Sequence, residues 1–380
     1  QRATTVKSVV GSHAAYAGER DGAAGGVGVG GTRVGVKCLH AHYAYHLAGG
    51  VDPVGAEVAA AVEPVHEVPM AWTCVAAIDQ GTNSTRLLVL GEFDPVRGPV
   101  ELARDLEITR LGKGVDDRGS LYLDAISRAT GCIATYVRRA RVLGATRVRV
   151  AATSAVRDAA NREDFLRAVR REGPDVTVEV LSGEEEAEVT FAGATAGLDA
   201  PAPFLVLDIG GGSTEFVLGD ADGVRASRST QMGSVRLTER CVRSDPPTAE
   251  DLAAVRAEIE RVLDEVERSV PVRAARTLVA VAGTTTTVQG IALGLPRYDP
   301  ERIHRSVLTL EDARKVAARL AGEPRGDRAR HPVMPPGRED VIVAGAEILV
   351  ATMARFGFAS ALVSEHDILD GLAVGALRGR

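Results

Sequence analysis

Short apolar runs alternate with segments of helical periodicity from about residue 74 to residue 378. Apolar runs predict strands at 75–78, 86–90, 148–152, 176–181, 204–209 and 278–281. Apolar side chains recur at helical spacing over 120–143, and further helices are expected from Ser182 and over 248–269, 338–356 and 365–378. Asn161, with Asp164 three residues later, is expected to cap another helix. Strands that alternate with helices predict an α/β fold.

One strand-and-turn pattern occurs twice, at an offset of 129 residues. Residues 78–86 read Ile-Asp-Gln-Gly-Thr-Asn-Ser-Thr-Arg, and residues 207–215 read Leu-Asp-Ile-Gly-Gly-Gly-Ser-Thr-Glu. Each copy predicts a β-hairpin whose tip presents backbone N–H groups and small polar side chains. Chance recurrence of a short Asp-x-Gly hairpin is the alternative. The repeat predicts a duplicated fold in which two such loops face each other across a cleft.

The first 69 residues differ from the rest in composition and in hydrophobic periodicity. They hold 12 of the 41 glycines and five of the eight histidines, without a sustained helical or strand period. The chain begins with Gln1, whereas Met70 stands just before the first convincing strand. We expect residues 1–69 to be disordered or a non-native extension, and not a signal peptide. The expected domains are then 70–196 and 197–380.

Composition excludes several classes of protein. The net charge of −6 and the pI near 5.8 argue against a nucleic-acid binder. No apolar run approaches the ~18 residues of a membrane span. The four cysteines form no CxxC pair, which favours the reducing cytoplasm. Lysine occurs only at positions 7, 37, 113 and 315, so an anion site here must be built from arginine, backbone amides or a metal ion.

Three glycine–hydroxyl turns and one strand end are candidate phosphate sites. Consecutive glycines let the backbone approach a ligand closely, and clustered amides suit an anion. Arg86 lies on the same strand face as Ser84, although it could equally be a solvated strand residue. Hydroxyls and a forked arginine at 153–157 can meet a phosphate, with an ordinary helix cap by Thr153 or Ser154 as the alternative. The candidates are Gly81, Thr82, Asn83, Ser84, Arg86, Thr153, Ser154, Arg157, Gly210, Gly211, Gly212, Ser213, Gly283 and Thr284.

A run of carboxylates opens the helix after Ser182. Ser182 and Glu185 have the spacing of a capping box, which gives Glu185 a structural role. Glu186 lies ~100° further round the helix and is not used by the cap. Crowded carboxylates raise one another's pKa, which suits a general base near neutral pH. The alternative for Glu186 is a solvated acidic first turn.

These motifs together resemble the exopolyphosphatase/guanosine-pentaphosphate phosphohydrolase family, within the actin, sugar-kinase and Hsp70 ATPase superfamily. The strings at 78–86, 152–159, 182–187, 207–215 and 283–287 occur in the order and spacing of the family. The resemblance implies two actin-like domains, of the ribonuclease H-like type, with the active site in the cleft between them. It also implies that the last helix, 365–380, packs back on the first domain. It implies Glu186 as the catalytic residue that activates water, and Asp79, Asp208 and Glu215 as acids of a Mg²⁺ site. The extent, about 74–378, is similar to that of the short actinobacterial members.

The implied activity is Mg²⁺-dependent release of terminal phosphate from inorganic polyphosphate, with a monovalent cation such as K⁺ as an optional addition. Hydrolysis of guanosine pentaphosphate is the nearest alternative, followed by a kinase of the same superfamily and a non-catalytic sensor of guanosine tetra- or pentaphosphate. A homodimer is compatible with the sequence. Two positions depart from the family pattern: Ala282 replaces the first of two glycines, and Glu188 replaces an arginine, which weakens the case for long polyanions.

Overall fold

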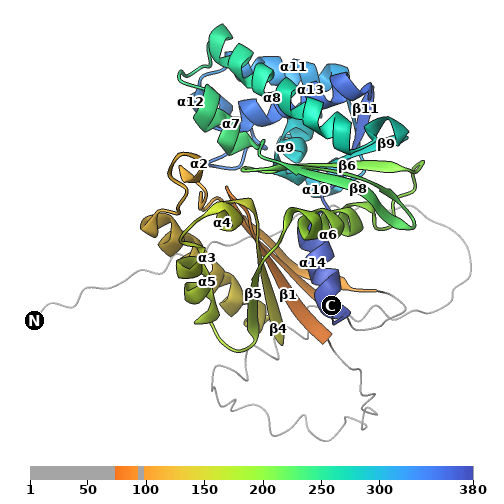
Figure 1. Ribbon diagram of the computed structural model, residues 1–380. Helices are drawn as coiled ribbons and strands as arrows, with labels where there is room; N and C mark the ends of the chain where they lie inside the picture. The colour runs from red at the N-terminus through yellow and green to blue at the C-terminus, as the bar shows by residue number, and fades with distance from the viewer. Residues whose placement is uncertain (1–72, 93–97, 380) are drawn as a thin grey trace, which may run out of the picture. The chain divides into compact units, whose positions relative to one another are not determined.

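The computed structural model describes residues 73–92 and 98–379, and the prediction for residues 1–69 therefore lies outside the described residues. Two mixed β-sheets, each with its own helices, form two lobes (Figure 1). None of the described helices is both long and apolar enough to cross a bilayer.

The first lobe is built on a five-stranded sheet in the order β3-β2-β1-β4-β5. β2 pairs antiparallel with β1 and β3, whereas β4 is parallel to β1 and β5. Alternate residues of these strands pack one face of the sheet against α3 and α5. The strands span β1 Thr73–Gln80, β2 Thr85–Glu92, β3 Val100–Glu107, β4 Arg147–Ala152 and β5 Val176–Val180, and the helices span α2 Val115–Arg118, α3 Leu123–Val142, α4 Ser154–Asp158 and α5 Arg162–Arg170.

The second lobe repeats this plan with six strands in the order β10-β11-β9-β6-β7-β8. One sheet face packs on the apolar sides of α8, α9, α11 and α13. The strands span β6 Phe204–Ile209, β7 Thr214–Asp220, β8 Gly223–Thr230, β9 Thr277–Val281, β10 Val307–Thr309 and β11 Ser360–Val363. The helices span α7 Ser234–Cys241, α8 Ala249–Ser269, η1 Val272–Ala274, α9 Ala282–Ala292, α10 Pro300–Ile303, α11 Leu310–Gly322, α12 Arg325–Arg328 and α13 Ile342–Phe356.

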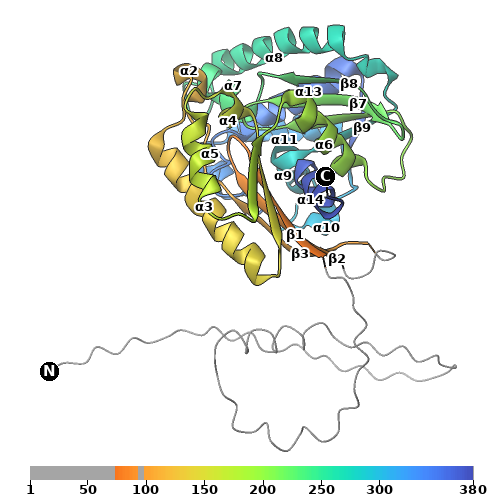
Figure 2. The ribbon, with the colours of Figure 1, turned by 60° about the horizontal axis from the view of Figure 1, so that its bottom comes forward.

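Two helices are exchanged between the lobes. α6 (Gly183–Thr195) follows the first sheet in sequence, yet Phe191 and its apolar neighbours pack on the second sheet. α14 (Ile368–Leu377) follows the second sheet and packs on the first, through Leu372 and its neighbours. The two helices lie side by side (Figure 2), and they contact each other through glycines. A Cβ on Gly193 would lie 2.0 Å from the carbonyl oxygen of Asp367, and a Cβ on Gly371 would lie 2.2 Å from that of Val189.

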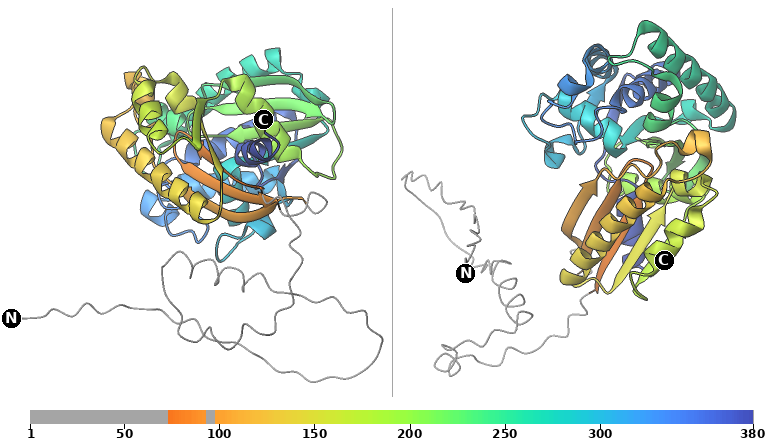
Figure 3. Two further views of the ribbon diagram at one scale, coloured as in Figure 1. Left: turned by 90° about the horizontal axis from the view of Figure 1, so that it is seen from below. Right: turned by 90° about the vertical axis from the view of Figure 1, so that its left-hand side faces the viewer.

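The side view in Figure 3 shows the two lobes stacked on each other. The ends of β1 and β6 lie at the cleft between the lobes, since Asp79, Asp208 and Ile209 line it. Most predicted elements are confirmed, although α3, α13 and α14 begin three or four residues after their expected starts. Asn161 stands at the N-cap position of α5, but the prediction that it caps the helix is wrong. Its side chain instead bonds both the N–H and the carbonyl of Leu121, because the loop before α3 passes within reach.

Candidate active site

A cleft of about 470 Å³ lies between the lobes and gathers most of the predicted residues. Its walls include both hairpin tips, the start of α6, the start of α9 and the residues before α14. Every predicted site residue except Ser154 and Arg157 lines it. Those two lie directly behind the wall: Ser154 faces Gly212, and Arg157 contacts Glu186.

The two hairpins of the repeat have matching geometry. Asp79 is paired with Arg86 in the β1–β2 register, and Asp208 is paired with Glu215 in the β6–β7 register. Each tip is closed by one hydrogen bond, from Gly81 N to the Ser84 carbonyl (2.9 Å) and from the N–H of residue 210 to the carbonyl of residue 213 (3.0 Å). The same position of the repeat thus holds a cation in the first lobe and an acid in the second.

The carbonyl groups of both tips are bonded from outside the cleft. In the first tip, the carbonyls of residues 82 and 83 accept hydrogen bonds from the N–H groups of Gly112 and Arg110 (2.8 and 2.9 Å). In the second tip, the carbonyls of residues 210 and 211 accept from Ser234 and Val235 at the start of α7 (2.9 and 2.8 Å). Because a trans peptide is planar, the N–H of the next residue points the opposite way from each carbonyl.

The amides on the other side of these peptides have no protein partner. In the part of the chain that the structure describes, no acceptor is bonded to the N–H of residues 82, 83 and 84 or of residues 211, 212 and 213. All six residues line the cleft. Clustered backbone N–H groups without a protein acceptor attract an anion, so these six amides in two facing loops indicate a place for one.

The two tips are packed against each other. A Cβ on Gly212 would lie 2.6 Å from both Thr82 Oγ1 and Ser154 Oγ, and a Cβ on Gly211 would lie 3.1 Å from Thr82. Glycine is therefore required here by the close approach of the first lobe. The hydroxyls of Thr82 and Ser154 are buried and have no hydrogen-bond partner among the described residues. Thr153 is the N-cap residue of α4, but its side chain makes no capping hydrogen bond.

Glu186 is buried in the first turn of α6. Ser182 and Glu185 form the expected capping box, which leaves the Glu186 carboxylate free of the cap. Burial raises the pKa of Glu186 to about 7, although the Arg157 guanidinium opposes the rise. Arg157 Nη1 donates to Glu186 Oε2 over 2.8 Å and to the Leu181 carbonyl over 2.9 Å. Arg157 therefore holds the glutamate in this structure.

Arg86 crosses from the first hairpin to the start of α14. Its Nε and Nη2 donate to Asp79 Oδ2 (2.9 and 2.7 Å), and its Nη1 donates to Asp367 Oδ2. Asp79 Oδ1 is buried and has no hydrogen-bond partner among the residues that the structure describes. Burial raises the pKa of Asp79, against the nearby charge of Arg86. One carboxylate oxygen of Asp79 is thus left for a ligand that the chain does not supply.

Asp208 and Glu215 are two further buried acids of the cleft wall. Burial raises the pKa of both well above the ordinary range. The charges of Asp367 and Glu186 add to the rise for Asp208, and those of Glu186 and Asp208 add to it for Glu215. Glu215 Oε1 accepts from Ser229 Oγ at 2.8 Å, whereas no described group donates to the carboxylate of Asp208. Among the described residues, no three acidic, histidine or cysteine side chains lie close enough to enclose a metal ion by themselves.

The third turn opens α9 beside an arginine that the sequence analysis missed. Gly283 and Thr284 line the cleft, and Arg338 Nη1 donates to the Gly283 carbonyl (2.8 Å) and to Thr287 Oγ1 (2.9 Å). Arg338 has no carboxylate within salt-bridge distance in the described chain, and burial lowers its pKa to about 10. Ala282 has φ of 65°, a left-handed conformation that favours glycine.

Asp367, Glu365 and Tyr298 also line the cleft without having been predicted. Tyr298 Oη donates to Glu365 Oε1 at 2.7 Å, and burial raises the pKa of Glu365 to about 7. A signal was present, because polar residues 364–367 follow the apolar strand β11 directly. A helix was expected from residue 365 instead, which concealed the strand end. Glu188, the unusual residue of α6, is exposed and does not line the cleft.

The sequence profile of the Ppx/GppA phosphatase family matches residues 94–378. The chain belongs to this family. Exopolyphosphatase 2 of Mycobacterium tuberculosis is 44% identical over 317 residues, which cover 80% of this chain and 99% of that protein. A second profile, of a family of unknown function (DUF501), matches residues 5–60, outside the described residues.

Solved structures of Ppx/GppA proteins have the same fold. The crystal structure of an exopolyphosphatase-like protein is 36% identical, with a TM-score of 0.76 over 81% of this chain and 99% of that chain. The Ppx/GppA family member of Aquifex aeolicus is 31% identical, with a TM-score of 0.68 over the same shares. The predicted family is confirmed, and so is an α/β fold that this chain shares with solved Ppx/GppA structures and that is built on two mixed sheets.

Proposed function

We propose that this protein is an exopolyphosphatase, which hydrolyses the terminal phosphoanhydride bond of inorganic polyphosphate. The observation that carries the proposal is the pair of facing loops with six unpaired amides beside the buried Glu186. The relative named exopolyphosphatase 2, which is similar over nearly its whole length, supports the choice of substrate.

The terminal phosphoryl group binds between the two hairpin tips. The amides of residues 82–84 and 211–213 and the hydroxyls of Thr82 and Ser213 donate to its oxygens, which stabilises the charge that spreads over them in the transition state. Glu186 accepts a proton from the attacking water, and a pKa near 7 suits this role at neutral pH. Arg157 orients the Glu186 carboxylate.

The residues of the cleft fit a magnesium ion. Asp208 has a buried carboxylate that accepts no described hydrogen bond, Asp79 has one unpartnered oxygen, and Glu215 lies opposite Asp208 in the sheet. Mg²⁺ takes one or two carboxylates and completes its shell with phosphate oxygens and water, so a cage of three acids is not needed. When bound, the ion neutralises charge on the phosphates.

The three described cysteines are free thiols, which supports a reducing compartment such as the cytoplasm.

Guanosine pentaphosphate is the second candidate substrate. The cleft exceeds the space that one phosphoryl group needs, and part of its wall is apolar or aromatic, with Tyr298, Leu106 and Val341. Such side chains suit a purine better than a chain of phosphates.

Phosphate release separates these possibilities. Long and short polyphosphate, guanosine pentaphosphate and ATP are compared with Mg²⁺ present, and we expect the fastest release from polyphosphate.

Glu186→Gln should lower kcat by about 10²–10⁴-fold. Glu185→Gln is the matched control, because glutamine preserves the capping box and leaves the base in place. Equal activity of the two variants would remove Glu186 from its role, and binding of guanosine pentaphosphate without turnover would indicate a sensor.

A further inference from the structure

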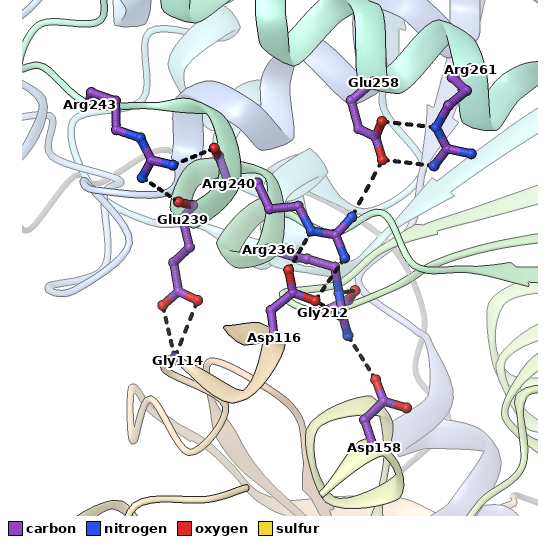
Figure 4. Close-up of polar contacts among 10 residues, drawn as sticks. All are labelled: Gly114, Asp116, Asp158, Gly212, Arg236, Glu239, Arg240, Arg243, Glu258 and Arg261. Carbon is purple, nitrogen blue, oxygen red and sulfur yellow. Dashed lines mark hydrogen bonds and ion pairs between the residues drawn. The ribbon is translucent and has the colours of Figure 1, made fainter. Parts of the chain in front are cut away.

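Arg236 is a buried arginine of α7 that joins the second hairpin tip to the first lobe. Its Nε donates to the Gly212 carbonyl over 2.7 Å, its Nη1 bonds Asp116, and its Nη2 donates to Asp158 over 2.8 Å. Figure 4 shows the guanidinium between these three acceptors. Arg236 is only 8% exposed and does not line the cleft, so it does not contact the substrate.

The three acceptors belong to the machinery behind the two loops. Gly212 carries two of the peptides whose N–H groups face the cleft. Asp116 belongs to α2, just after the segment whose N–H groups bond the carbonyls of the first tip. Asp158 ends α4, one residue after Arg157, which holds Glu186. One side chain therefore connects the backing of the second loop with that of the first and with the support of the base.

Among the described residues, Arg236 is the only hydrogen-bond donor to the third carbonyl of the second tip. The carbonyls of residues 210 and 211 are held by the N–H groups of α7, whereas that of Gly212 accepts from Arg236 Nε. Fixing this carbonyl also fixes the N–H of Ser213, which is part of the same rigid peptide and points the opposite way.

Neighbouring charged residues bond Asp116 and Gly114 without touching the loop. Arg240 bonds Asp116 and reaches Glu258, and Glu239 accepts from the N–H of Gly114 (Figure 4). Burial by itself would raise the pKa of Asp116. The hydrogen bonds and charges of Arg240 and Arg236 have the larger combined effect, and they lower this pKa below its usual value. Asp116 is therefore ionised throughout the neutral range.

We propose that Arg236 is a positioning residue for phosphoryl transfer, which sets the second phosphate-binding loop at its working distance from the first by binding Gly212, Asp116 and Asp158 together. The inference rests on the proposed function of the two loops. A loop displaced by a fraction of an ångström still binds phosphate, but its amides no longer match the charge distribution of the transition state. Loss of Arg236 should therefore lower kcat more than it raises KM.

The test compares Arg236→Met with Arg240→Met in the full chain. Both arginines bond Asp116, but only Arg236 bonds the loop. We expect Arg236→Met to lower kcat for polyphosphate by about tenfold or more with KM changed by less than about threefold, and Arg240→Met to stay within about twofold of the parent. Asp158→Asn, which removes one acceptor of Arg236, should lower kcat to an intermediate value. Equal loss in the two arginine variants, or a kcat of Arg236→Met within twofold of the parent, would overturn the proposal.

Two additions keep the test decisive. If Arg236→Met does not fold, Arg236→Lys preserves the charge but not the three-way fork, and the same loss of kcat is expected. Hydrogen exchange at the amides of Ser234 and Val235, which donate to the loop, needs no substrate. Faster exchange there in Arg236→Met but not in Arg240→Met supports the positioning role even if the parent does not hydrolyse polyphosphate. Unchanged exchange overturns it.

Discussion

Arg157 Nη1 lies 2.8 Å from Glu186 Oε2, although the two residues belong to different helices and 29 positions separate them. The guanidinium favours the ionised carboxylate, while burial favours the neutral acid and is the larger effect. The balance puts the pKa of Glu186 at about 7. A base of this kind is partly protonated under physiological conditions, and its neighbours decide how much.

Removing Arg157 should shift the pH dependence of catalysis. In Arg157→Met the carboxylate loses its cation, so the pKa of Glu186 should rise by about one unit or more. Because the base must be ionised, the acidic limb of the kcat/KM profile should move to higher pH. Arg167→Met, at an exposed position of α5, is the control and should leave the profile in place. A profile that does not move in Arg157→Met would show that Glu186 is not the titrating base.

Magnesium should stabilise the protein more at high pH than at low pH. The pKa values of Asp208 and Glu215 are raised above their ordinary values of 3.8 and 4.5, mainly by burial. Their contribution to stability is therefore complete below about pH 4 and is lost as the pH rises through the raised values. A bound cation lowers the free-energy cost of ionising these two buried acids. The rise in Tm caused by Mg²⁺ should therefore be larger at pH 8 than at pH 5.5.

The double variant Asp208→Asn, Glu215→Gln is the control for this measurement. It keeps the shape of both side chains but cannot bear the charge that attracts the ion. Its Tm should respond little to Mg²⁺ at either pH. A full Mg²⁺ response in this variant would place the ion elsewhere.

Gly212→Ala should separate the two phosphate-binding loops. The added Cβ would lie 2.6 Å from Thr82 Oγ1 and Ser154 Oγ, and one loop must move to relieve the contact. We expect kcat/KM to fall by about 10²-fold, as on loss of a transition-state donor. Gly131→Ala is the matched control, because its Cβ meets open space on α3 and activity should be unchanged. Parental activity in Gly212→Ala would show that the tips need not touch.

Ala282→Gly should stabilise the fold. Ala282 has φ of 65°, which costs a residue with a Cβ about 1–2 kcal/mol, whereas glycine loses about 0.5–1 kcal/mol of chain entropy. The net gain in the free energy of unfolding should be about 0.5–1 kcal/mol, measured by urea denaturation. Ala292→Gly, at the exposed end of the same helix, should destabilise instead. Destabilisation by both changes would contradict the strain at residue 282.

Local patterns predicted the hairpins and several helices because their signals lie within a few residues. The strands that carry Asp79 and Asp208 are continuous apolar runs, and α8 opens with a capping box of Thr248 and Asp251. Spacing alone therefore suggested which residues meet at the two tips. The proposed roles of those residues stay predictions for the experiments above.

Contacts between distant parts of the chain were beyond this reasoning. Arg86 bonds Asp367 across 281 positions, and Arg236 bonds Asp116 across 120. Neither arginine has a local pattern that names its partner, because the partner is set by how the lobes pack. The packing of α6 on the second sheet was hidden for the same reason: an apolar helix face matches either sheet equally well. The packing of α14 on the first sheet was expected, but only from the family resemblance.

The contact of Gly193 with the backbone of residue 367, and of Gly371 with that of Val189, brings the backbones of α6 and α14 together at one crossing. We expect two helices that touch in this way to turn about the crossing more easily than they slide or part. We therefore expect the crossing to act as a pivot between the lobes. Opening of the cleft for a long polyanion is then a rotation of the lobes, so the mouth widens with distance from the pivot. A side chain added at this crossing, as in Gly193→Ala, should alter how far the mouth of the cleft opens. It changes none of the residues proposed to contact phosphate.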